Sequence, residues 1–89
     1  MKVSDNFIYR EIAGESLVIP AGEAALTVKG LIALSESGKL LYQKLQGGCS
    51  KEDLVATLTS EYDVSKEEAG KDVDAFLEQL RQLNMLVEE

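Results

Sequence analysis

The first third of the chain contains short apolar runs rich in β-branched and aromatic residues, a composition typical of strands. Residues 7–12 and 17–20 are two such runs, and the turn-like segment 13–16 between them favours an antiparallel hairpin. A third run at residues 30–34 predicts another strand, although periodicity alone would also allow a helix over so few residues. Ser35 favours the strand, because serine is a good N-cap for a helix that begins after it. We also expect a short extended piece at residues 26–28.

The rest of the chain has apolar positions spaced by three or four, which predicts amphipathic helices. Three helices are expected, at residues 36–46, 51–62 and 66–83. The third has a wide inner apolar stripe, formed by Ala69, Val73, Phe76, Leu77, Leu80 and Leu83.

Polar residues mark the ends of these helices. Ser50 with Asp53, and Ser65 with Glu68, have the spacing of capping boxes, in which two side chains satisfy each other's free backbone N–H groups. Asn84 can end the last helix in a left-handed conformation. The apolar residues 85–87 that follow are expected to fold back onto the core.

Three strands with one apolar face need a covering layer, and the three helices can supply it. The sequence therefore predicts a single domain over residues 1–89 of the α+β class. We expect a small winged-helix-like fold, β3α3, with three N-terminal antiparallel strands followed by three helices. The second and third helices, joined by a very short connector, resemble a helix-turn-helix pair.

The composition of the 89-residue chain excludes most kinds of catalytic site. Histidine is absent, which removes the commonest general base and metal ligand. Cys49 is the only cysteine, so a disulfide within the chain is impossible and a reduced, cytoplasmic protein is expected. No apolar run is long enough to span a membrane. We therefore expect neither an enzyme, nor a bound cofactor or metal, nor a membrane protein.

The net charge of −7 lies entirely in residues 50–89, which hold four Lys/Arg and eleven Asp/Glu. A helix-turn-helix pair would suggest DNA binding through the helix at 66–83. That helix has more exposed carboxylates than cations, whereas DNA-binding surfaces are basic, so nucleic acid is not the expected partner. The acidic surface could attract basic segments of a partner or could simply keep a small domain in solution.

A sheet of three strands leaves an open edge, to which an extended peptide can add as another strand. The run at 30–34 is short and uncharged, which leaves its edge receptive. We predict a groove floored by Leu77, rimmed by Asp74 and Arg81, and lying beside Ile32. The alternative is that Val73 and Leu77 are simply core residues. The peptide-binding residues predicted in this way are Leu31, Ile32, Ala33, Leu34, Val73, Asp74, Leu77 and Arg81.

Several motifs follow one another along the chain: LVIP at 17–20, GLIALSESG at 30–38, LYQKL at 41–45, Ser50-x-x-Asp53-Leu54, LTSEYDV at 58–64 and DVDAFLEQL at 72–80. Through this ordered set, from about residue 3 to residue 87, the chain resembles PqqD-like proteins, the stand-alone form of the RiPP precursor peptide recognition element. Two positions depart from the usual pattern: Ser35 stands where the family commonly has Asn, and Tyr42 where it commonly has Trp.

The resemblance implies a peptide chaperone without a cofactor, which binds the leader segment of a ribosomally synthesised precursor peptide. The leader is expected to add to the third strand, against the third helix, and to be presented to a modifying enzyme, often a radical SAM protein. Whether the product is pyrroloquinoline quinone or another modified peptide stays open. The alternative function is a winged-helix-like interaction module in a transcriptional or enzyme complex, without peptide presentation.

Overall fold

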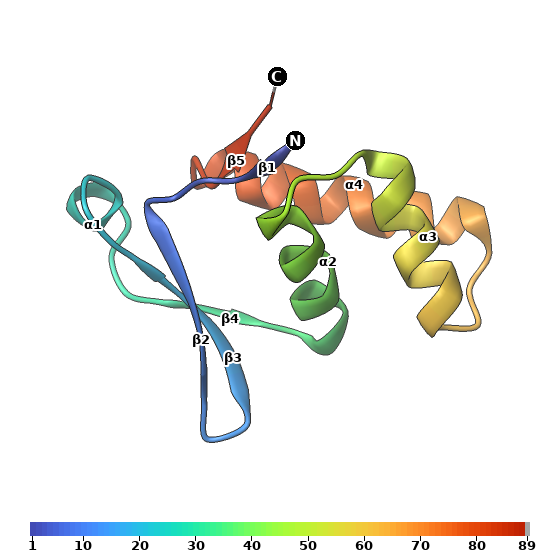
Figure 1. The fold of residues 1–89 in the computed structure, drawn as a ribbon, viewed down its shortest axis with the longest axis horizontal. Helices are drawn as coiled ribbons and strands as arrows, with labels where there is room; N and C mark the ends of the chain where they lie inside the picture. The colour runs from blue at the N-terminus through green and yellow to red at the C-terminus, as the bar shows by residue number, and fades with distance from the viewer. Residues whose placement is uncertain (89) are drawn as a thin grey trace.

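The computed structural model describes residues 1–88 and places a three-stranded antiparallel sheet beside a group of helices (Figure 1). The strands are β2 (Phe7–Ile12), β3 (Glu15–Pro20) and β4 (Ile32–Leu34), in the order β2-β3-β4. Val18 lies in the middle of the sheet, opposite Tyr9 on one side and Ile32 on the other. The predicted hairpin and the third strand are confirmed, although β3 begins two residues earlier than expected and β4 is shorter.

The hairpin turns in two residues, Ala13 and Gly14, because Ile12 pairs directly with Glu15. Their φ angles are 54° and 82°, respectively. Two successive residues with positive φ are typical of a type I′ turn, whose twist matches that of the flanking strands. This turn sets the register of β2 against β3.

The three predicted helices are present and agree with the expected bounds to within one residue. Each begins after a serine whose hydroxyl accepts a hydrogen bond from the backbone N–H three residues on. The helices are α2 (Glu36–Gln46), α3 (Lys51–Glu61) and α4 (Lys66–Gln82).

The two expected capping boxes differ in the structure. At the start of α3, Ser50 accepts from the Asp53 N–H at 3.2 Å and the Asp53 carboxylate accepts from the Ser50 N–H at 3.1 Å. At the start of α4, the Ser65 hydroxyl accepts from the Glu68 N–H at 3.1 Å, without the reciprocal bond. The box predicted at Ser65 is therefore only half formed, because the exposed Glu68 carboxylate can be hydrated instead.

The β3α3 order is correct for the main elements but incomplete. The extended piece expected at 26–28 is wrong: the segment is mostly the short helix α1 (Ala24–Thr27). Two further strands, β1 (Lys2–Val3) and β5 (Leu86–Val87), pair antiparallel as a second small sheet. Because they come from opposite ends of the chain, local sequence patterns could not reveal their pairing.

The core lies between the sheet and the helices. Tyr42 of α2 is fully buried, and its ring stacks on that of Tyr9 from β2 at a centroid distance of 6.0 Å. The C-terminal residues fold back as expected: Asn84 has a φ of 57°, and Met85 after it is fully buried. Among residues 1–88, no helix has both the length and the apolarity needed to cross a bilayer.

Candidate functional site: an open strand edge beside α4

The outer edge of β4 has no partner strand among residues 1–88, because β4 pairs with β3 on its other side only. Ile32 and Leu34 are half-buried and pack against the core, whereas Ala33 between them is exposed. An edge strand of this kind presents free backbone N–H and C=O groups that can pair with another chain. Lys29 and Glu36 are the nearest charged residues in the sequence, so the strand itself brings no charge that would oppose pairing.

A groove of about 240 Å³ lies between β4, the start of α2 and the C-terminal half of α4. The apolar part of its wall comes from residues far apart in the sequence, and Ser35 and Gln79 are its polar side chains. Among residues 1–88, no ionisable side chain lines the groove, so it can hold an apolar side chain but offers no general acid or base. Its main apolar contributors are Ile32, Leu34, Phe76, Leu80, Leu83 and Met85.

Gly38 sets the width of this groove at its α2 end. A Cβ atom placed on Gly38 would lie 3.2 Å from the Ser35 hydroxyl oxygen and 3.4 Å from the Phe76 ring. The glycine therefore allows α2 to approach α4 closely while Ser35 still caps α2.

The N-terminal turn of α2 is further held by the Lys39–Glu11 ion pair at 2.6 Å. Through that contact, Lys39 lowers the pKa of the Glu11 carboxyl.

The structure brings together only part of the predicted peptide-binding set. Ile32, Ala33 and Leu34 line the groove, and Leu31 precedes them as an exposed apolar residue. Val73 and Leu77 are 0% and 2% exposed, which agrees with the alternative that they are core residues. The predicted floor at Leu77 is therefore wrong in geometry: this side chain does not border the groove beside β4.

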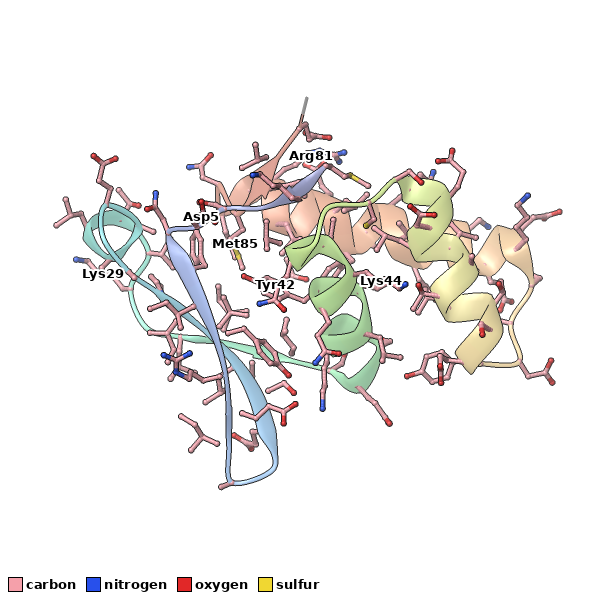
Figure 2. All side chains as sticks on the ribbon, in the orientation of Figure 1. Asp5, Lys29, Tyr42, Lys44, Arg81 and Met85 are labelled. Carbon is pink, nitrogen blue, oxygen red and sulfur yellow. The ribbon has the colours of Figure 1, made fainter. Side chains whose placement is uncertain are left out.

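Asp74 and Arg81 lie on a different face of α4. Together with Leu77 they border a separate hollow near the N-terminus. Arg81 donates to the Glu88 carboxylate at 2.8 and 3.0 Å, and Asp74 pairs with Lys51 at 2.8 Å. Figure 2 shows Arg81 beside the chain termini, away from β4, so neither residue rims the groove as predicted.

The error is one step around the helical wheel. Successive residues of an α-helix are about 100° apart, so a groove assigned to Leu77 instead of Phe76 turns toward another neighbour. The sequence signal for the face that borders β4 was present, since Phe76, Leu80 and Leu83 already belonged to the predicted apolar stripe. Gln79 was missed because a polar residue beside that stripe has no distinguishing pattern.

No curated protein matches this chain. Two solved structures share the fold, although their sequence identities are low. One, described as "TbiB1 in Complex with the TbiA(beta) Leader Peptide", has a TM-score of 0.82 and 24% identity, over 100% of this chain and 98% of that one. The other, "Lasso peptide synthetase B1 complexed with the leader peptide", has a TM-score of 0.80 and 21% identity, over 98% and 96%.

These matches confirm the expected α+β fold over the whole chain, and the family follows from the sequence itself. The sequence profile of the family described as "Coenzyme PQQ synthesis protein D (PqqD)" matches residues 18–86, a stretch that runs from the middle of β3 to the first residue of β5. This chain therefore belongs to the PqqD family.

Proposed function

We propose that this protein binds the leader segment of a ribosomally made precursor peptide and presents it to a modifying enzyme. The observation that carries the proposal is the uncharged edge of β4, which pairs with no strand in the described part of the chain and lies beside an apolar groove of α4. Membership of the PqqD family supports it. So do the two structures of the same fold, whose descriptions name bound leader peptides.

In this proposal the leader adds to β4 as a further strand. Backbone hydrogen bonds to the edge of β4 supply affinity without regard to sequence, and side-chain pockets supply specificity. Side chains of a strand alternate in direction, so every second leader residue faces the sheet side that packs on the helices. One of them can enter the groove beside Phe76 and Leu83, which is large enough for a bulky apolar side chain.

The protein acts as a chaperone in this scheme, in keeping with a groove that has no ionisable side chain in its lining among residues 1–88. The modifying enzyme supplies the chemistry and any cofactor, and a radical SAM enzyme is the partner that we expect. Leader binding takes place in the cytoplasm, where precursor peptides are synthesised.

The proposal is tested by titrating the isotope-labelled full chain with the leader peptide of a precursor encoded beside its gene. We expect shifts at residues 31–34 and at Phe76, Gln79 and Leu83. Tight binding that leaves all of these signals unshifted would contradict the site.

A matched pair of variants sharpens this test, because Gln79 and Gln82 are both exposed on α4 but only Gln79 lines the groove. Gln79→Lys places a charge where the bound leader would exclude water, and we expect about a tenfold loss of leader affinity. Gln82→Lys adds the same charge outside the groove and should leave the affinity within about twofold of the unmodified protein. Equal effects of the two variants would reject the groove as the leader site.

A further inference from the structure

A second groove, of about 720 Å³, lies between α3 and the N-terminal half of α4. Val55 and Val64 form its apolar floor, and the small residues Ala56, Thr59 and Gly70 form its sides. It shares no lining residue with the groove beside β4. In Figure 1, α3 and the N-terminal part of α4 lie at the end of the molecule away from the hairpin, so a partner bound here would leave the edge of β4 accessible.

Neither the backbone conformation nor the packing of the chain requires glycine at position 70. Gly70 lies inside α4, is not among the residues with positive φ, and a Cβ atom placed on it would meet nothing within 4 Å. Glycine within a helix lowers its stability relative to alanine. Neither backbone conformation nor internal packing accounts for this cost, whereas the missing side chain keeps the groove open for close approach by another molecule.

The charge at this groove differs from that of its surroundings. Residues 50–89 contain only four Lys/Arg against eleven Asp/Glu, yet Lys51 and Lys66 both line the groove, and Glu52 is its one acidic residue among residues 1–88. Lys51 pairs with Asp74, but no carboxylate in residues 1–88 forms an ion pair with Lys66. A partner that brings a carboxylate to this groove could form an ion pair with Lys66.

We propose that this groove docks an amphipathic helix of a partner protein, with apolar side chains on Val55 and Val64 and a carboxylate at Lys66. Helix-in-groove binding uses an apolar stripe at i, i+3, i+4 and i+7, and the small side chains let the helix axes approach closely. This groove is separate from the one beside β4, so the proposed helix docking can be tested independently of the proposed leader binding.

The test uses two synthetic helical peptides of about 18 residues, long enough to hold a helix when stapled. Both carry leucines at the spacing of one helical face, and they differ only in having glutamates or lysines beside that stripe. We expect the glutamate peptide to bind the labelled full chain about tenfold more tightly than the lysine peptide. Signals of Val55, Thr59 and Gly70 should shift, and Lys66→Glu should reverse the preference between the peptides.

Two substitutions of Gly70 separate docking from folding. Gly70→Ala should raise the midpoint of thermal unfolding by about 4 °C, because the added methyl group meets no atom and alanine favours the helix. Gly70→Leu fills the groove and should abolish binding of the glutamate peptide while leaving leader affinity unchanged. The proposal would be overturned if both peptides bound equally well or if the shifts were confined to other surfaces. A lower melting midpoint for Gly70→Ala, or self-association of the chain through this groove, would also overturn it.

Discussion

Tyr42 is the residue whose polar group is least well accommodated in the core. Its side chain is fully buried and stacks on Tyr9, yet its hydroxyl has no hydrogen-bond partner among residues 1–88. Burial also raises the pKa of this phenol, because the charged form would lose its hydration. The aromatic ring therefore stabilises the core, and the hydroxyl opposes part of that gain.

We expect Tyr42→Phe to leave the free energy of unfolding unchanged or to raise it by up to about 1 kcal/mol, since it removes an unsatisfied buried group. The folded-state pKa lies above the unfolded one, so this tyrosine's contribution is intact below about pH 10 and is lost as the pH rises toward the folded value. The phenylalanine variant should thus lose less stability in alkali. Urea unfolding at neutral and alkaline pH measures both effects.

Tyr9→Phe is the matched control, because the Tyr9 hydroxyl is bonded to Glu11 at 2.8 Å and to Ser16 at 3.2 Å. Its removal should cost about 1 kcal/mol. A loss of similar size for Tyr42→Phe would mean that a buried water satisfies the Tyr42 hydroxyl.

Among the elements, the β2–β3 hairpin determines where the open edge of β4 lies. The tight turn at Ala13 and Gly14 sets the register of β3, and Ala33 of β4 in turn pairs with Leu17. A shift of one residue would exchange the two faces of the sheet and move Ile32 and Leu34 away from the groove. The leader binding proposed at β4 would thus depend on a turn that is not part of the groove.

The turn is not optimised, because alanine adopts a positive φ at a cost of about 1 kcal/mol. Asparagine tolerates this conformation and is favoured at the first position of type I′ turns. Ala13→Asn should therefore raise the free energy of unfolding by about 0.5–1 kcal/mol. Gly14→Ala should lower it by about 1 kcal/mol, because Gly14 has a φ of 82°. Chemical denaturation checks both, and the same sign for the two variants would contradict the assigned turn.

In the molecule as a whole, the N-terminal and C-terminal segments of the chain contact each other through the pairing of β1 with β5. The Met1 amino group donates to the Cys49 carbonyl at 3.0 Å. Glu88, just after β5, is held by Arg81 of α4, which lowers the pKa of the Glu88 carboxyl. Arg81 has a structural partner in this arrangement, on a face of α4 other than the one beside β4.

Replacing Arg81 by glutamine therefore tests both the contact between the two chain ends and the original assignment of this residue to the leader. We expect faster amide hydrogen exchange in β5, a Glu88 pKa that returns toward its usual range, and leader affinity within about twofold of the unmodified protein. Because the folded pKa of Glu88 is lowered, the contribution of the pair is present above the ordinary carboxyl pKa and is lost as the pH falls through the folded value. The free energies of unfolding of the variant and the unmodified protein should therefore become equal in acid.

A large loss of leader affinity in Arg81→Gln, with exchange in β5 unchanged, would instead place the leader over the face of Asp74 and Arg81. Asp74→Asn is a useful companion variant, because it breaks the Lys51 pair without touching β5. It should alter neither leader affinity nor exchange in β5.

Features that depend on short-range interactions can be predicted from the amino-acid sequence alone. Ser35, Ser50 and Ser65 cap the helices because each hydroxyl needs only a backbone N–H three residues away. The strand positions and the apolar stripe of α4 follow from equally local periodicity. Tertiary structure alone decided which part of that stripe meets β4, since the rotation of a helix about its axis depends on packing with Gly38 and Met85. It also decided the pairing of β1 with β5, because contacts between the two ends of a chain leave no local pattern.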